Sequence, residues 1–319
     1  MKKLAVGIDI GGTNTVIGIV DKKGKIYFQS SISTQKHAEI ENYISEICSV
    51  IDTGTKTIKE EYELVGIGVG APNGNYYKGT IEDAANLRWQ GIIPFTSLFK
   101  KYYDIPVFLT NDANAAAIGE MIYGGAKNMK EFVVITLGTG LGSGIVVNGK
   151  VLYGHDGFAG ELGHTIVEPN GRRCNCGRQG CLETYVSATG MVRTVYEQLA
   201  FNIESSELRD IPYSKMTSKK IFEAAQKHDY IALETFKKTA KILGKAIADY
   251  VAIASPEAVF LFGGVANAGS MLFEQVQYYM EKYMLSVFSN KVKLLPSDLG
   301  ENAAILGSSA LVWAELKKD

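Results

Sequence analysis

Short apolar runs alternate with polar turns and with longer amphipathic stretches along this chain. Near the N-terminus, the pattern predicts three consecutive strands at residues 4–9, 16–21 and 26–30. Residues 37–62 then place five aliphatic side chains at helical spacing, which predicts an amphipathic helix. Apolar runs at 64–72 and 105–112 predict buried strands, and the alanine-rich stretch 113–124 predicts a helix. Strands that alternate with helices indicate an α/β fold.

The strand pattern of the N-terminus returns later in the chain. Residues 132–153 repeat the order of residues 4–27: a β-prone run, a Gly-Thr turn, a second run, a Gly-Lys turn and a third strand that ends in Tyr. With Gly12 set against Gly138, a single one-residue gap aligns the later turns. The repeat indicates an internal duplication with a cleft between the halves. The alternative is a chance likeness between two hairpins.

This organisation leads us to expect two lobes. A small N-terminal α/β lobe is predicted over residues 1–115 and a large α/β lobe over residues 116–300. The apolar helix expected at about 301–319 would pack back on the first lobe. A metal-binding segment, residues 164–181, would belong to the large lobe.

Composition and charge narrow the class of protein. The chain has 319 residues, of which 46% are hydrophobic, and its net charge is -1, so disorder is not expected. Lys and Arg total 33 against 34 Asp and Glu, which gives no electrostatic basis for binding nucleic acid. The apolar run near the N-terminus is broken at Asp9, and no run approaches the length of a membrane span. We therefore expect a cytoplasmic protein that binds neither nucleic acid nor membrane, and a homodimer or higher homo-oligomer.

The first candidate site is the turn after the first strand, with Asp9, Gly11, Gly12 and Thr13. Glycines in a tight turn let backbone N–H groups approach phosphate oxygens, and the threonine hydroxyl adds a donor. The carboxylate of Asp9 could hold Mg²⁺, directly or through water. An ordinary glycine-containing hairpin is the alternative.

The second candidate site is the matching turn of the repeat, with Gly138, Thr139 and Gly140. More glycines follow in this segment than a hairpin turn requires. The position that matches Asp9 is Ile135, so only the first copy can supply a metal-binding carboxylate. Two such turns that face each other across a cleft would hold a polyphosphate from both sides.

A third candidate is Asn111 with Asp112, at the end of a predicted strand and the start of a predicted helix. Ligands of α/β folds bind at such strand ends. A carboxylate there could accept the proton of an attacking hydroxyl group. Either residue could instead be a helix N-cap, and the two roles can coexist.

Three of the four cysteines cluster after a histidine. His164, Cys174, Cys176 and Cys181 form a set with one imidazole and three thiolates, which fits a closed structural Zn²⁺ site. Unpaired thiols, a disulfide or a zinc ribbon that binds nucleic acid are the alternatives. The last is disfavoured because no aromatic residues are interleaved with the few arginines nearby.

Glu161 and Glu183 bracket the metal segment, and their carboxylates would suit sugar hydroxyl groups as well as solvent. Gly263 and Gly264 follow a predicted strand, where a bare backbone could pack flat against an adenine or ribose. A tight turn between a strand and a helix would explain the two glycines equally well.

Together these motifs resemble the ROK family, which contains sugar kinases, sugar-responsive repressors and uncharacterised relatives. The resemblance covers essentially the whole chain. The motifs occur in the family's order: DIGGT at 9–13, ND at 111–112, GTGLG at 138–142, GELGH at 160–164 and CNCGRQGCLE at 174–183. The resemblance implies a two-lobed hexokinase/actin-like (ribonuclease H-like) α/β fold with a duplicated β-meander plus helices.

The resemblance also implies roles for individual residues. Asp112 would be the catalytic base, and His164 would contact both zinc and sugar. Gly263 and Gly264 would lie beside the adenosine of ATP. The implied sugar ligands are Asn86, Asn111, Asp112, Glu161, His164 and Glu183.

We therefore expect an ATP-dependent kinase that phosphorylates the 6-hydroxyl of a hexose, with glucose as the expected substrate and with Mg²⁺ and a structural Zn²⁺. An N-acetylmannosamine kinase is the alternative kinase. A sugar-sensing protein without a DNA-binding domain is the alternative that is not an enzyme. A DNA-binding regulator is disfavoured because the first phosphate motif starts too near the N-terminus for a preceding helix-turn-helix.

The choice of glucose over N-acetylmannosamine depends in part on Tyr76 and Tyr77. If their rings turn inward, they would fill the space that an N-acetyl group needs.

Overall fold

The computed structural model describes residues 1–317, which fold into two compact units. Unit 1 contains residues 1–129, residues 144–160 and the segment from Ser297 onward, whereas unit 2 contains residues 130–143 and 161–296. The chain therefore passes from one unit to the other four times. No helix within residues 1–317 combines the length and the apolar character needed to cross a membrane.

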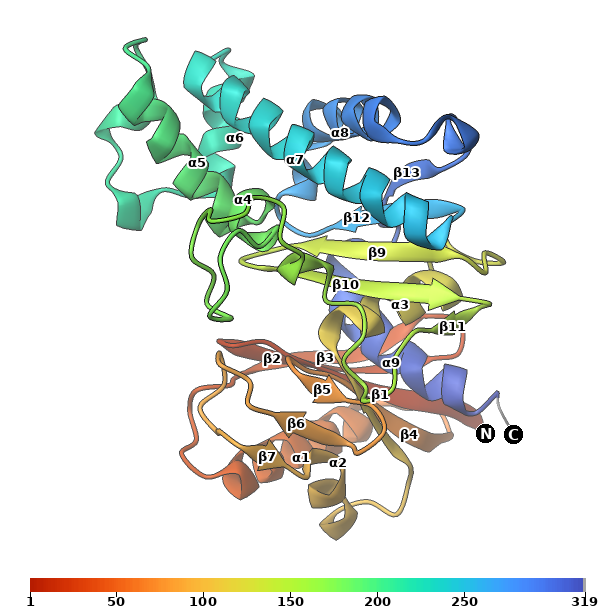
Figure 1. Ribbon diagram of the computed structural model, residues 1–319. Coiled ribbons are helices and arrows are strands. Elements are labelled where there is room, and N and C mark those ends of the chain that lie inside the picture. The colour runs from red at the N-terminus through yellow and green to blue at the C-terminus, as the bar shows by residue number, and fades with distance from the viewer. Residues whose placement is uncertain (318–319) are drawn as a thin grey trace. The chain divides into compact units, whose positions relative to one another are not determined.

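Unit 1 is built on a five-stranded sheet with the order β3-β2-β1-β4-β8 (Figure 1). Its strands are β1 (Lys2–Ile10), β2 (Asn14–Asp21), β3 (Ile26–Ser33), β4 (Tyr62–Gly70) and β8 (Val107–Thr110). The first three strands form the predicted antiparallel meander, and β4 and β8 continue the sheet in parallel with β1. Because parallel strands end at the same edge, Asp9 and Asn111 both lie at this edge of the sheet.

Helix α1 (Ile40–Thr57) buries an apolar face that includes Tyr43, Ile47 and Ile51. The helix is shorter than the predicted range 37–62. Residue Tyr62 already belongs to β4, where it pairs with Lys2 of β1. Sheet pairing thus takes over from the helical pattern before the end of the predicted range.

The C-terminal helix α9 (Ala303–Glu315) contacts β1, β2 and β4 of unit 1 and packs against α3 (Asp112–Ile122) (Figure 1). It lies on a row of glycines, because Gly7 pairs with Gly18 on one side and with Gly68 on the other. A Cβ atom on Gly68 would lie 2.0 Å from the carbonyl oxygen of Ser308. Glycines therefore allow the helix backbone to approach the sheet this closely.

A smaller sheet in unit 1 positions the loop that carries Asn86. Its order is β5-β6-β7, with β5 (Gly74–Asn75), β6 (Thr80–Glu82) and β7 (Ile92–Ile93). Helix α2 (Phe95–Leu98) and the 3-10 helix η1 (Phe99–Lys101) follow it, and their buried rings Phe95 and Phe99 join the apolar core that β1 and α1 share. Asn86 lies in the connection between β6 and β7.

The second large sheet has the order β11-β10-β9-β12-β13. Its strands are β9 (Phe132–Leu137), β10 (Leu141–Val147), β11 (Lys150–Val151), β12 (Ala258–Phe262) and β13 (Lys293–Pro296). Strands β9 and β13 both pair in parallel with β12. The predicted repeat is therefore present as a second meander, although its third strand has only two residues.

Helices supply the rest of unit 2. The α-helices are α4 (Glu183–Val186), α5 (Ala188–Phe201), α6 (Ser218–Gln226), α7 (Tyr230–Ala254) and α8 (Ser270–Tyr283). Short 3-10 helices are η2 (Leu162–His164), η3 (Glu207–Asp210), η4 (Tyr213–Lys215), η5 (Ala266–Ala268) and η6 (Ser286–Phe288), and η7 (Gly300–Asn302) precedes α9. The long helix α7 packs against α5, α6 and α8 (Figure 1).

The two units do not coincide with the predicted lobes 1–115 and 116–300. Residue 115 lies inside α3, whose whole length stays in unit 1 because α3 packs on α9. Residues 144–160 also return to unit 1. A Cβ atom on Gly144 would lie 2.4 Å from the carbonyl oxygen of Ala113, so this part of β10 runs directly against α3.

Candidate active site and metal centre

Asp9 lies near the end of β1, half-buried, opposite Gly70 of β4. A Cβ atom on Gly70 would lie 3.3 Å from Asp9 Oδ1, so the glycine leaves room for the carboxylate. Burial raises the pKa of Asp9 to about 7, and the negative charge of Asp112 contributes to the rise. The two carboxylates thus interact electrostatically at one edge of the sheet.

Asp112 is the first residue of α3, and Asn111 is its N-cap. The backbone N–H of Ala113 donates to Asn111 Oδ1 and to Asp112 Oδ1, both at 2.8 Å. Asp112 is an exposed residue, although neighbouring protein atoms partly desolvate its carboxyl group. This desolvation raises the pKa of Asp112, and the backbone hydrogen bonds oppose the rise only in part. A carboxylate with a raised pKa is a better proton acceptor.

The turn after β1 lies against the predicted sugar ligand Asn86. A Cβ atom on Gly12 would lie 3.1 Å from the carbonyl oxygen of Asn86. The side-chain amide of Gln35 donates to the carbonyl oxygens of both Gly12 and Asn86. Thr13 is held as well, because its carbonyl oxygen accepts a 2.9 Å hydrogen bond from the Thr34 N–H. Sequence reasoning missed Gln35, since nothing in the local pattern marks a side chain that bonds to distant carbonyls.

In unit 2, the turn from Gly138 to Gly140 joins β9 and β10 and is closed by a 3.0 Å hydrogen bond from Gly138 N to Gly140 O. Gly263, with φ of +103°, follows the neighbouring parallel strand β12. A Cβ atom there would lie 2.7 Å from the carbonyl oxygen of Leu137, whereas one on Gly264 would meet no atom within 4 Å. The structure thus brings Gly138, Thr139, Gly140, Gly263 and Gly264 to neighbouring strand ends.

Glu183 lies between this turn and the cysteine cluster. Its Oε2 accepts a 2.9 Å hydrogen bond from the backbone N–H of Leu141. Its Oε1 lies 3.7 Å from Cys174 Sγ. The predicted sugar ligand is therefore in contact with both the glycine turn and one predicted metal ligand.

The side chains of His164, Cys174, Cys176 and Cys181 converge, and one potential ligand atom from each lies within 4.8 Å of all the others. Cys174 Sγ is 3.7 Å from His164 Nδ1, and Cys176 Sγ is 3.7 Å from Cys181 Sγ. Zn–S bonds of about 2.3 Å in a tetrahedron separate two sulfurs by about 3.8 Å. Burial raises the pKa of Cys174 to about 12, and a bound cation is what stabilises a thiolate in such surroundings. The donor set and its spacing therefore fit Zn²⁺.

Tight turns and one arginine hold the metal segment. Gly177 and Gly180 have φ of +87° and +78°. A Cβ atom on Gly171 would lie 2.1 Å from the hydroxyl oxygen of Tyr185, so this glycine serves close packing rather than an unusual φ. Arg172, with 11% of its side chain exposed, pairs with Glu197 and lies over the Tyr185 ring. The segment is thereby fixed to α4 and α5.

His164 directs its two ring nitrogens to different neighbours. While Nδ1 faces Cys174, Nε2 lies 3.9 Å from Oε2 of Glu161. Glu161, His164 and Glu183 therefore surround one side of the cysteine cluster. One ring can thus face a metal ion and a polar ligand at the same time.

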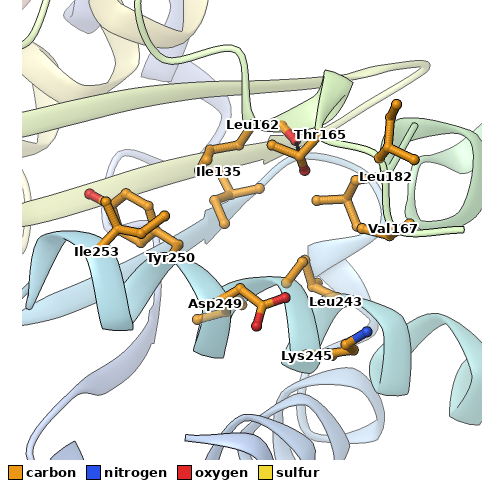
Figure 2. A pocket seen from close by; sticks show the side chains of 13 residues that line it. Ile135, Leu162, Thr165, Val167, Leu182, Leu243, Lys245, Asp249, Tyr250 and Ile253 are labelled. Atoms are coloured by element: carbon orange, nitrogen blue, oxygen red, sulfur yellow. Dashed lines mark hydrogen bonds between the residues drawn. The ribbon is translucent and has the colours of Figure 1, made fainter. Parts of the chain in front are cut away.

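An apolar hollow of about 160 Å³ lies in unit 2 between α7 and residues 162–167. Figure 2 shows Ile135 on the β9 side of this hollow, and Tyr250 and Ile253 on the α7 side. None of the predicted site residues lines it. The position that matches Asp9 in the repeat therefore faces an apolar environment.

The rings of Tyr76 and Tyr77 have partners within unit 1. The Tyr76 ring stacks on Tyr153 with centroids 4.0 Å apart, and its hydroxyl donates to Glu315. The Tyr77 hydroxyl donates to the carbonyl oxygen of Gly154. These contacts use residues outside the predicted sugar ligands, so the expectation that the rings fill an acetyl pocket has no support.

The sequence of this chain is similar to those of known proteins. The family model described as ROK family matches residues 5–315. A glucokinase from Halalkalibacterium halodurans is 36% identical over 311 residues, which cover 96% of this chain and 94% of that protein.

Two solved structures have a similar fold. A ROK family glucokinase from Streptomyces griseus, in complex with glucose and AMPPNP, has a TM-score of 0.80 and 30% identity, and the match covers 97% of this chain and 98% of that one. A ROK family transcriptional regulator, a homologue of the E. coli MLC protein, has a TM-score of 0.88 and 25% identity over 99% of this chain and 79% of that one. The predicted fold class, a hexokinase/actin-like α/β fold, is confirmed.

Proposed function

The chain belongs to the ROK family, and from this premise we propose that it is an ATP-dependent hexose kinase that converts glucose to glucose 6-phosphate. One structural observation carries the proposal: two carboxylates, Asp9 and Asp112, share one edge of the first sheet and both have a raised pKa. The names of the similar proteins support the substrate pair, since one is a glucokinase and one structure contains glucose with an ATP analogue.

In the proposed reaction, Asp112 accepts the proton of the sugar 6-hydroxyl as that oxygen attacks the γ-phosphoryl group of ATP. Asn111 uses its amide oxygen to cap α3, which orients its amide nitrogen as a donor for a sugar hydroxyl group. The α3 N-terminus adds partial positive charge beside the reacting groups. Excluding water would prevent hydrolysis of ATP in place of transfer.

The sugar would be bound by Asn86, Asn111, Asp112, Glu161, His164 and Glu183. The ATP phosphates would contact the backbone of the two glycine turns, Gly11–Thr13 and Gly138–Gly140. Gly263 and Gly264 would leave a flat surface for the adenosine, because no side chain projects there. A cytoplasmic location and homo-oligomeric assembly stay predictions.

Asp9 would hold Mg²⁺, and the donor chemistry fits, since a desolvated carboxylate beside a second carboxylate favours a nearby cation. When bound, Mg²⁺ would neutralise charge on the transferred phosphoryl group.

A structural Zn²⁺ would be held by His164, Cys174, Cys176 and Cys181. Metal analysis by mass spectrometry should find about one zinc per chain, and Cys176→Ser should lose it. A fully active protein without zinc would contradict this assignment.

A sugar panel tests the proposed activity. Release of ADP from ATP is measured in a coupled assay with glucose, N-acetylmannosamine and other hexoses. We expect the highest kcat/KM with glucose. A higher value with N-acetylmannosamine would replace the substrate but keep the reaction.

A sugar-sensing regulator is the second candidate, favoured by the TM-score of 0.88 to a ROK transcriptional regulator. The same panel separates the two functions. Calorimetric binding of a hexose without ADP release from any sugar would favour the sensor.

A further inference from the structure

We infer that residues 183–189, which comprise α4, Ser187 and the first two residues of α5, act as a brace that positions the Gly138–Gly140 turn, and that the metal centre thereby supports nucleotide binding as well as sugar binding. The inference rests on the proposed function, because that turn is assigned to the ATP phosphates there. It assigns a positioning role to Thr189.

The brace holds the backbone of the turn at three points. Glu183 Oε2 accepts from the Leu141 N–H at 2.9 Å. The Ala188 N–H donates to the carbonyl oxygen of Gly138 at 2.9 Å, and the Thr189 hydroxyl donates to that of Thr139, also at 2.9 Å. A glycine-rich turn has little conformational preference of its own, so external hydrogen bonds must fix it.

The start of the brace is joined directly to the metal centre. Cys181 precedes Glu183 by two residues, and its carbonyl oxygen accepts hydrogen bonds from the Thr184 N–H at 3.0 Å and the Thr184 hydroxyl at 2.8 Å. A second predicted ligand, Cys174, has its Sγ 3.7 Å from Glu183 Oε1. If the cysteines are released, the Cys181 backbone to which Thr184 is hydrogen-bonded loses its anchor, and the start of the brace, including Glu183, can shift.

The fit between the brace and the turn is close. A Cβ atom on Gly140 would lie 2.4 Å from Glu183 Oε2. A side chain at residue 140 would therefore displace the carboxylate that is proposed to bind sugar. Movement of the turn and movement of Glu183 are thus coupled in both directions.

Thr189→Val tests the brace, since valine has nearly the same shape but cannot donate to Thr139. We expect KM for ATP to rise about threefold to tenfold, as for one lost hydrogen bond, with KM for glucose changed less than about twofold. Thr189→Ser should restore the wild-type value. The matched control is Thr53→Val, which removes a 2.8 Å bond from an exposed threonine hydroxyl to the Ser49 carbonyl in α1. An unchanged KM for ATP in Thr189→Val would overturn the role of Thr189.

A second measurement tests the link to the metal without turnover. Binding of a non-hydrolysable ATP analogue, without sugar, is followed by calorimetry in wild type, in Cys176→Ser and after zinc chelation. We expect weaker binding after metal loss and faster amide hydrogen exchange at residues 138–141. The exchange at residues 4–10 of β1 serves as the internal control for folding.

The outcomes separate this inference from the proposed function. If wild type turns over no hexose, the kinase proposal fails, whereas the exchange measurement still reports on the brace. If the kinase is active but metal loss changes neither analogue binding nor exchange at residues 138–141, the link to the metal centre is wrong.

Discussion

The two five-stranded sheets have the same strand order, yet their chemistry differs. In each, a meander of three strands is extended by two parallel strands, giving β3-β2-β1-β4-β8 and β11-β10-β9-β12-β13. The first sheet ends in two carboxylates, Asp9 and Asp112. In the second, Ile135 occupies the position of Asp9 and faces the apolar hollow beside α7. The two sheets thus share a strand order, but the first has carboxylates at its strand ends and the second has an isoleucine at the position that matches Asp9.

The different surroundings of Asp9 and Ile135 explain why the two positions carry different side chains. Around Asp9, Gly70 leaves room for the carboxylate, and the site stays polar. Ile135 is 2% exposed and lines a hollow whose other side chains are mainly aliphatic and aromatic, with Lys245 and Asp249 also present. A carboxylate is tolerated in the first setting because a cation or a proton can compensate it, whereas the second setting is mainly apolar and has one cationic side chain, Lys245, on its lining.

The strongest test of this comparison is Asp112→Asn. Asparagine keeps the shape but cannot accept the proton, so kcat should fall about 10²–10⁴-fold. Binding of glucose, measured by calorimetry, should be retained. A rate within about threefold of wild type would show that the carboxylate is not the base.

Introducing a carboxylate at residue 135, the position that matches Asp9, should destabilise the second sheet. Ile135→Asp places a carboxylate at a buried position on a mainly apolar hollow and should lower the free energy of unfolding by about 3–5 kcal/mol. Ile135→Val, which removes one methylene group, should cost only about 0.5–1.5 kcal/mol. Denaturant unfolding measures both. Equal losses in the two variants would mean that polarity at this position does not distinguish the sheets.

The pKa of Asp9, raised to about 7, predicts a pH effect on metal-dependent binding. Only the deprotonated carboxylate binds Mg²⁺, so KM for Mg-ATP should rise as the pH falls through 7, by up to about tenfold per pH unit. Above about pH 8 it should be constant. Asp9→Asn is the control, because it removes this part of the pH dependence. The same slope in both proteins would assign the effect to ATP itself.

The smallest expected effect is a gain in stability. Because partial desolvation raises the pKa of Asp112, its charged form destabilises the folded state at neutral pH, so Asp112→Asn should raise Tm slightly at pH 8, with the size limited by the exposure of the residue. The gain should shrink as the pH falls through the raised pKa, since the folded wild type then takes up a proton. Asp104→Asn, at a second exposed aspartate, is the control. A gain that grows on acidification would contradict the sign.

Much of the fold was predictable because strand signals are local. The first meander and the start of its repeat follow from apolar runs between turns. The end of α1 did not, since the helical pattern continues until Tyr62 pairs with Lys2, a partner 60 residues away. The return of residues 144–160 to unit 1 depends on the contact of Gly144 with Ala113, which no local pattern reveals.

Some residues of the candidate site can also be predicted from the sequence, and others cannot. The sequence alone points to His164 and the three cysteines, because ligand type and spacing carry the signal. Gln35 and Thr189 were missed, since each acts by a hydrogen bond to a distant carbonyl oxygen. The contacts of the Tyr76 ring could not be predicted because its partners, Tyr153 and Glu315, lie far along the chain.

The glycine row that receives α9 has a consequence for biosynthesis. Gly7, Gly18 and Gly68 leave the ribosome well before α9, which begins at Ala303. While the residues between Gly68 and Ala303 are being made, the face of the first sheet that carries these glycines lacks its covering helix. An uncovered sheet face of this kind is prone to association with other nascent chains. The nascent protein would therefore be a natural client for chaperones until residues 303–315 emerge and close the sheet.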